Sequence, residues 1–180
     1  VYNWGIFDFE DPLTFALNFY KGILIYRLGA YPYQVAMRNY KSEERTVWED
    51  KLFLSRDEKK IFLDRLAWNM KAENRSYAYQ YFFDNCSTRP RDYLDEALGG
   101  ALSAEMKKVL SPMSFRDQMI EGYQYNPGMD ALLDLGMNSR LDRPMSQWER
   151  MFHPIHLRGN LLEYSRSKKY LIGESRILVE

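Results

Sequence analysis

The stretch "RSYAYQYFFDNCSTRPRDYLDEALGG" constrains the fold most, because two hydrophobic periods meet inside it. In its first part, 75–84, aromatic side chains recur at every second position, which predicts a strand with one aromatic face: Tyr77, Tyr79, Tyr81 and Phe83. From Ser87 onward the period becomes helical, and the pair Gly99–Gly100 predicts the end of that helix. The sequence therefore predicts a strand-to-helix junction at Cys86, the one cysteine among 180 residues.

The position of Cys86 allows two interpretations. A thiol at the amino end of a helix lies near backbone N–H groups that stabilise an anion, and this lowers the pKa of the thiol. The same N–H groups can stabilise an oxyanion when the sulfur attacks a carbonyl. Alternatively, Cys86 is a buried filler, Ser87 and Thr88 cap the helix, and Asp84 and Asn85 form the turn. The residues alone leave both interpretations open.

A nucleophilic cysteine needs a base, normally a histidine. The chain holds two, His153 and His156, in "MFHPIHLRGN". Pro154 predicts an extended or turn conformation at His153, and a loop histidine is more often a surface residue than a base. Two histidines without a cysteine or carboxylate at suitable spacing do not predict a zinc site. We expect no metal and no cofactor.

Further elements follow from caps and alternation. Strands are expected at 1–10, 23–28 and 46–54, and helices after Asp11–Pro12, from 33 through Tyr40, after the capping box of Ser55 and Glu58, and after Ser103 and Ser114. Residues 123–180 are expected to form a loop-rich part with short helices, including a weak amphipathic helix at 156–171. We interpret 1–180 as one α+β domain.

Composition narrows the class of partner. Lys and Arg together number 25, as do Asp and Glu, so the net charge of 0 does not predict a nucleic-acid partner. Aromatic residues make up 16%, with 14 Tyr. Such residues suit interfaces and membrane-facing grooves, although a tyrosine-rich sheet in an ordinary core explains them as well.

Four segments, in this order, resemble the periplasmic domain of bacterial lipoprotein N-acyltransferases of the Lnb type: "YNWGIFDFEDP", "AENRSYAYQYFFDNCSTRPRDYLDEAL", "SFRDQMIEGY" and "LLDLGMNSRLDRPMS". The resemblance covers nearly the whole chain, and "FFDNCSTRPRD" is its most specific part. It implies a circularly permuted papain-like (NlpC-like) fold, in which a small antiparallel sheet packs on helices and the cysteine lies at a helix N-terminus.

The resemblance also implies thioester chemistry. Cys86 matches the family's nucleophile. It would take an acyl chain from a membrane phospholipid and pass it to the α-amino group of a lipoprotein's lipidated N-terminal cysteine. The expected partners are therefore a phospholipid, a lipoprotein N-terminus and the membrane surface, with no nucleic acid, and the expected location is the periplasm, in association with a bacterial membrane.

The family's histidine lies on a glycine-histidine strand just upstream of the "YNWGIFDF" segment, so we expect the domain in residues 1–180 to lack that strand. His153 and His156 fall where the resemblance leads us to expect apolar residues, and we do not assign them to catalysis. The strand at 1–10 would neighbour the histidine strand, which makes Asn3 and Asp8 candidates to orient the base; alternatively they are turn and sheet-edge residues.

The residues beside Cys86 are expected to support it: Asp84, Asn85, Ser87, Thr88 and Arg89. For Arg89 an ion pair with Asp84 or Asp92 is favoured over binding of a lipid phosphate. Two other functions stay open. One is a cysteine amidase or peptidase that acts on cell-wall peptides, and the other is a non-catalytic binding module.

Overall fold

The computed structural model describes residues 1–7, 14, 18, 24–123, 139–168 and 170–179. Within these ranges the fold is mixed α/β with small antiparallel sheets. The strands pair in the order β1-β2-β4 (Tyr2–Phe7, Ile25–Ala30, Ser76–Ala78), β3-β7 (Val47–Leu52, Ile172–Val179) and β5-β6 (Leu110–Ser114, Pro144–Ser146). The helices are α2 (Tyr33–Ser42), α3 (Arg56–Asn69), α4 (Thr88–Ala97), α5 (Ala101–Met106), α6 (Phe115–Tyr123), α8 (Gln147–Arg150) and α9 (Pro154–Ser167), with a 3-10 turn η1 (Ser139–Leu141).

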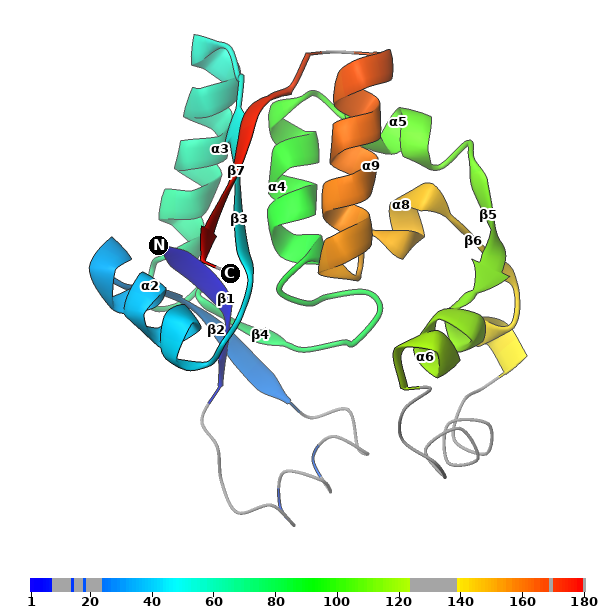
Figure 1. The fold of residues 1–180 in the computed structure, drawn as a ribbon, viewed down its shortest axis with the longest axis horizontal. Helices are drawn as coiled ribbons and strands as arrows, with labels where there is room; N and C mark the ends of the chain where they lie inside the picture. The colour runs from blue at the N-terminus through cyan, green and yellow to red at the C-terminus, as the bar shows by residue number, and fades with distance from the viewer. Residues whose placement is uncertain (8–13, 15–17, 19–23, 124–138, 169, 180) are drawn as a thin grey trace.

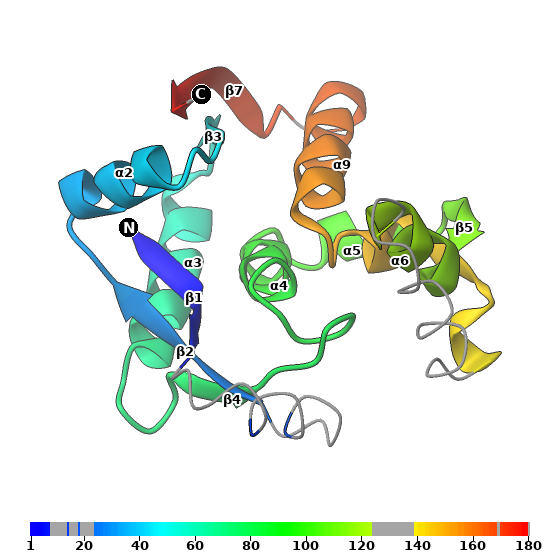
Figure 2. The ribbon, with the colours of Figure 1, turned by 60° about the horizontal axis from the view of Figure 1, so that its bottom comes forward.

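Helix α4 lies between α3 and α9 in both views of the ribbon (Figures 1 and 2). On one side Tyr93 packs in a cluster with Trp4 of β1 and Leu66 of α3. On the other side Leu94 and Leu98 pack in a second cluster, whose other buried members are Leu102, Met106, Met151, Tyr164 and Leu171. Because both sides of α4 are covered, its position fixes the position of the cysteine loop that precedes it.

The predicted helix ends agree with the structure at three places. Glu58 N–H donates to Ser55 Oγ (3.3 Å), and Ser55 N–H donates back to the Glu58 carboxylate (2.7 Å), so the capping box is confirmed. Beyond α4, Gly99–Gly100 adopt φ of +65° and +81°, which glycine tolerates best. At Ser114, the hydroxyl accepts from Asp117 N–H (3.1 Å) at the start of α6.

Ser103 does not begin a helix, so that prediction is wrong. Helix α5 begins at Ala101 after Gly100, and Ser103 lies inside it. Its backbone N–H donates to Asp95 Oδ1 (2.8 Å) in the last part of α4. The helix expected after Asp11–Pro12 lies outside the described residues.

The strand predicted over 75–84 is wrong beyond its first residues. Strand β4 covers only Ser76–Ala78, and the chain then makes a turn closed by a bridge between Gln80 and Asp84. Tyr81 and Phe82 both pack against a third cluster that contains Phe115, Met145 and Phe152. In 75–84 the aromatic residues do not fall on one predicted face only, because Phe82 lies between Tyr81 and Phe83. The alternating pattern therefore could not distinguish a strand from a turn that packs the consecutive rings of Tyr81 and Phe82.

The helix expected at 156–171 is confirmed as α9 (Pro154–Ser167), whereas the expectation of loops and short helices in 123–180 is wrong at strand β7. Helix α9 spans 14 residues, and strand β7 spans 8 and pairs antiparallel with β3. Strand β7 carries mostly exposed and partly exposed side chains, so it lacks the buried alternation that marks a strand in sequence. Its partner lies more than a hundred residues earlier, which local patterns cannot reveal.

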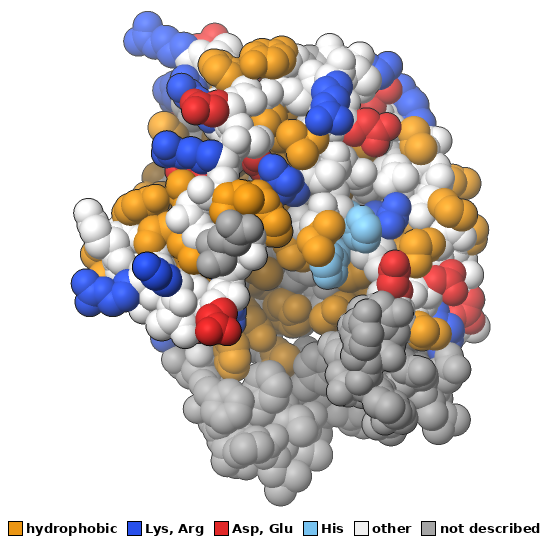
Figure 3. Space-filling model, in the orientation of Figure 1, with side chains coloured by type: hydrophobic (Ala, Val, Ile, Leu, Met, Phe, Trp, Pro, Cys, Tyr) orange, Lys and Arg blue, Asp and Glu red, His pale blue; other side chains and the backbone are white. Residues whose placement is uncertain are grey.

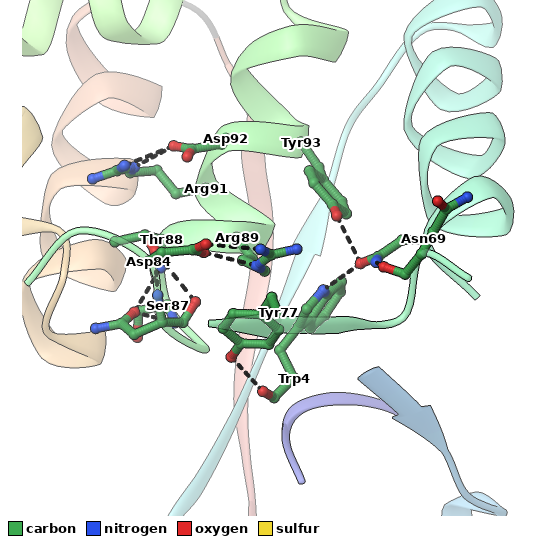
Figure 4. Close-up of polar contacts among 12 residues, drawn as sticks. Trp4, Asn69, Tyr77, Asp84, Ser87, Thr88, Arg89, Arg91, Asp92 and Tyr93 are labelled. Carbon is green, nitrogen blue, oxygen red and sulfur yellow. Dashed lines mark hydrogen bonds and ion pairs between the residues drawn. The ribbon is translucent and has the colours of Figure 1, made fainter. Parts of the chain in front are cut away.

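A buried hydrogen-bond network joins the sheet to the helices (Figure 4). Asn69 is 0% exposed, and its Oδ1 accepts from Trp4 Nε1 (3.0 Å) and from the Tyr93 hydroxyl (2.6 Å). Its Nδ2 donates to the carbonyl of Asn74 (2.8 Å), and the Tyr77 hydroxyl donates to the carbonyl of Trp4 (2.6 Å). The network fixes β1 relative to α3 and α4.

We predict that Asn69→Ala lowers the free energy of unfolding by about 2–5 kcal/mol, because two buried donors lose their acceptor. Chemical denaturation followed by circular dichroism measures this loss. The matched change Asn39→Ala, at an exposed side chain of α2, should stay within about 0.5 kcal/mol. Equal effects of the two substitutions would contradict the role given to the network.

A second prediction concerns acid. The hydrogen bond from Arg143, followed by those from Ser146, lowers the pKa of Glu149 to about 2. A carboxylate with a depressed pKa stabilises the fold above its unfolded pKa of about 4.3, and this contribution is lost as the pH falls through about 2. At pH 7, Glu149→Gln should cost about 1 kcal/mol of unfolding free energy, a value discounted for solvent screening.

Urea unfolding of wild type and Glu149→Gln across this range measures the difference, with Glu73→Gln at an exposed side chain as the control. The difference should shrink as the pH is lowered from 5 toward about 2. A difference that stays constant over this range would contradict the linkage.

Candidate functional site around Cys86

Cys86 directly precedes Ser87, the N-cap residue of α4, and its side chain is exposed. Strand β1 lies against it, since a Cβ added at Gly5 would lie 4.0 Å from the Cys86 Cβ. Burial raises the pKa of both Tyr26 and Tyr77. The negative charge of a Cys86 thiolate is the second cause of the rise in each case, so both phenols lie near the sulfur. The thiol therefore faces β1 and two tyrosines of the β1-β2-β4 sheet.

One carboxamide holds the loop on which Cys86 lies. Asn85 Oδ1 accepts from the backbone N–H groups of Ser87 (2.8 Å) and Thr88 (2.9 Å). Asn85 Nδ2 donates to the carbonyls of Tyr81 (2.7 Å) and Phe152 (2.9 Å). Asn85 is 5% exposed and thus links the preceding turn, the start of α4 and the segment before α9. Sequence reasoning placed Asn85 in the turn but did not identify it as the cap.

This arrangement corrects the expectation of an activated thiol. The N–H groups of Ser87 and Thr88, expected to stabilise an anion, already donate to Asn85, and Arg89 N–H donates to the Asn85 carbonyl (3.1 Å). Desolvation raises the pKa of the Cys86 thiol above its ordinary value. Hydrogen bonds from its own backbone N–H and from Ser87 lower that pKa but do not outweigh the desolvation. One side of the side chain meets solvent, while the surrounding protein excludes water from the rest.

The other residues beside Cys86 have structural partners. Ser87 makes no side-chain capping bond, whereas Thr88 Oγ1 accepts from Asn85 N–H (2.7 Å). Arg89 donates from Nε and Nη2 to the two oxygens of Asp84, both at 2.7 Å, and lies 3.8 Å above the ring centre of Tyr77 (Figure 4). Arg89 therefore forms the ion pair with Asp84 that was favoured over a phosphate site.

Of the two candidates for orienting a base, the structure describes one. Asn3 lies on β1, and its Oδ1 accepts from the backbone N–H of Gly5 (2.7 Å). This bond directs the Asn3 carboxamide toward the backbone of β1, the strand that lies beside Cys86. Asp8 lies outside the described residues.

The two histidines lie together away from the cysteine contacts. Their rings are 5.6 Å apart at the start of α9, where His153 is extended, as Pro154 predicts (Figure 3). Both line a cavity of about 480 Å³, and desolvation lowers the pKa of each imidazole. No contact among the described residues joins either ring to Cys86. Sequence reasoning missed the cavity residue Gln118, which is 6% exposed and sits on α6 within a pattern typical of an ordinary amphipathic helix.

We predict slow alkylation of Cys86 at neutral pH. Because desolvation raises the thiol pKa, the iodoacetamide rate should still be rising at about pH 9, instead of reaching a plateau near pH 7. Mass spectrometry over a pH series gives the rate, and Cys86→Ser controls for modification elsewhere. A plateau below about pH 8 would show an activated thiolate and contradict this prediction.

No described helix has the length and apolar character needed to cross a bilayer.

Comparison with known proteins identifies the family. No curated protein and no solved structure matches the chain. Residues 1–122, which contain the Cys86 loop, β1, the helices α2 to α5 and all but the last residue of α6, match the family model described as the Lnb N-terminal periplasmic domain. The chain therefore belongs to the Lnb family, and this part of it is a periplasmic domain.

Proposed function

We propose that this chain is the cysteine domain of an acyltransferase that moves an acyl chain from a membrane phospholipid to the N-terminal amine of a lipoprotein. The observation that carries the proposal is the placement of Cys86: an exposed thiol, rigidly held before α4 and against β1, in a chain of the Lnb family. A cysteine kept only for packing would be buried among apolar side chains.

The proposed reaction has two steps. The Cys86 sulfur attacks the ester carbonyl of the phospholipid, a C–S bond forms, the C–O bond breaks, and the lysophospholipid alcohol leaves with a proton. The free amine of the lipoprotein then attacks the thioester, a C–N bond forms, the C–S bond breaks, and the thiol is restored. Neither step consumes an oxidant, a reductant or a metal.

A thiol whose pKa is raised needs a base to become a nucleophile at neutral pH. We propose that the base is the histidine that the Lnb resemblance expects on a strand next to β1. Among the described strands, β1 ends the sheet order β1-β2-β4, so its other edge can pair with a further strand. This arrangement, with the helix of Cys86 facing the sheet, supports the circularly permuted papain-like fold as part of the proposal.

The surroundings of Cys86 favour an acyl chain over a polar peptide. Tyr26 stacks on Tyr79 at 4.3 Å and lies 4.9 Å from Phe7, measured between ring centres. Arg89, which lies over the ring of Tyr77, is already paired with Asp84. Aromatic faces without a free charge suit a hydrocarbon chain.

The test is acyl-adduct formation. The chain extended by the family's histidine strand is incubated with phospholipid vesicles and analysed by intact mass spectrometry. We expect a mass gain of one acyl chain that hydroxylamine removes, and its complete absence in Cys86→Ser. Ser42→Ala, at an exposed serine in the last turn of α2, should retain the adduct. No adduct on the extended wild-type protein would count against the proposal.

The main alternative is a cysteine amidase that acts on cell-wall peptides, because it would use the same nucleophile. Release of peptide fragments from muropeptides without lipid, abolished by Cys86→Ser, would favour it. A third alternative, a non-catalytic binding module, predicts that Cys86→Ala leaves the biological function intact.

A further inference from the structure

Gly5 brings the backbone of β1 next to the thiol. A Cβ built on Gly5 would lie 4.0 Å from the Cys86 Cβ, and both residues are accessible to solvent. Glycine in the interior of a strand weakens the strand, and it often marks a place where a ligand approaches the backbone closely. The chain therefore has an unfavourable strand residue at the position that lies beside its cysteine.

A β-bulge holds Gly5 in this place. The register of β1 on β2 shifts between Asn3 and Ile6, so Trp4 and Gly5 lie in the irregular part of the strand. There the Trp4 carbonyl accepts from the Tyr77 hydroxyl (2.6 Å; Figure 4), and the Gly5 N–H donates to Asn3 Oδ1 (2.7 Å). Bulges are frequent next to active sites, where they redirect part of a strand. Side-chain hydrogen bonds thus fix the backbone that faces Cys86.

The position of a side chain on residue 5 is largely open. Among the described residues, only Asn3 Oδ1 (3.1 Å) and Cys86 Cβ lie within 4 Å of the added Cβ. In a thioester on Cys86, the carbonyl carbon is two bonds from the Cys86 Cβ and the next carbon is three bonds away. Because the surrounding protein already desolvates the thiol, few directions are open to these carbons, and the space beside Gly5 is one of them.

Aromatic rings lie next to this space on the same sheet. Phe7, two residues after Gly5, pairs with Tyr26 of β2, and their ring centres are 4.9 Å apart. Tyr26 stacks on Tyr79 at 4.3 Å, and the charge of a Cys86 thiolate acts on Tyr26. A hydrocarbon chain that begins at the sulfur and passes Gly5 would therefore meet apolar ring faces.

We propose that Gly5 determines which acyl groups Cys86 accepts, because the space beside its Cα holds the first carbons of the acyl chain. A side chain on residue 5 occupies that space and excludes chains that are branched next to the carbonyl. The inference rests on the acyl transfer proposed above, and it adds the residue that sets the size limit at the reacting carbonyl.

Two activated esters test the size limit on the whole chain. p-Nitrophenyl butyrate carries a straight acyl group, and p-nitrophenyl isobutyrate carries one of the same mass that is branched next to the carbonyl. The Cys86 sulfur forms a C–S bond to the carbonyl carbon, the C–O bond breaks, p-nitrophenolate leaves, and the thiol proton passes to solvent. Intact mass spectrometry at about pH 9 gives the rate of the adduct that hydroxylamine removes, with N-acetylcysteine as the reference thiol.

Wild type should show the same ratio of the two rates as N-acetylcysteine, since glycine leaves room for either acyl group. Gly5→Ala should slow isobutyryl transfer at least about tenfold and butyryl transfer less, because one misfitting methylene changes a rate about 10- to 200-fold. Gly5→Val should slow both at least about tenfold. Gly159→Ala, at an exposed glycine of α9 whose added Cβ would meet nothing within 4 Å, should change neither rate.

A small reagent separates lost space from lost reactivity. Methyl methanethiosulfonate transfers only a methylthio group: an S–S bond forms on Cys86, the S–S bond of the reagent breaks, and methanesulfinate leaves. Gly5→Ala should react with it within about twofold of wild type. Because the added methyl group also meets Asn3 Oδ1, the double variant Asn3→Ala, Gly5→Ala is compared with Asn3→Ala and should show the same slowing of isobutyryl transfer.

Three outcomes would overturn the proposal: isobutyryl transfer to Gly5→Ala at the wild-type rate, equal slowing of both esters and the methylthio reagent, or no slowing in the double variant. Circular dichroism confirms that each variant is folded. The esters require neither a phospholipid nor a lipoprotein, so these outcomes are separate from those of the phospholipid adduct test.

Discussion

The carboxamide of Asn85 is the interaction on which the arrangement of the site depends. It uses its full hydrogen-bonding capacity, with two N–H groups of α4 on its oxygen and the carbonyls of Tyr81 and Phe152 on its nitrogen. These partners come from three parts of the chain: the turn after β4, the start of α4 and the segment before α9. A side chain with only the acceptor would lose the bonds to the carbonyls of Tyr81 and Phe152. A side chain with only the donor would lose the bonds from the N–H groups of α4. The position of Cys86 depends on both sets of bonds.

The same interaction explains why the thiol is not activated by its helix. The anion-stabilising power of a helix N-terminus resides in unpaired N–H groups. Here Asn85 occupies those of Ser87 and Thr88, so the loop gains rigidity while Cys86 loses the donors that would lower its pKa. The bonds of Asn85 thus fix the position of the sulfur, while desolvation holds the pKa of the Cys86 thiol above its ordinary value.

How much the sequence could predict depended on the range of each interaction. The capping box of Ser55 and the glycines after α4 were predictable because each acts within a few residues. The pairing of β7 with β3 and the burial of Tyr81 and Phe82 against Phe152 were not, because their partners lie far along the chain. At the site, the neighbouring residues of Cys86 were found, but the contacts of Asn85 with Phe152 and of β1 with the cysteine could come only from the folded structure.

Both sides of α4 hold buried polar atoms without a hydrogen-bond partner among the described residues. On the sheet side, the polar groups of Trp4, Tyr93 and Tyr77 have partners, whereas Arg65 Nε on α3 donates no hydrogen bond to a described residue and lies 3.4 Å from the Glu96 carboxylate, its ion-pair partner. On the α9 side, buried polar atoms of Gln118 and His153 make no hydrogen bond with a described residue. Natural folds rarely leave such groups without a use. Tyr81 and Phe152 line the cavity of about 480 Å³ beside the histidines, and their carbonyls also hold Asn85, so the cavity wall and the Cys86 loop share two residues.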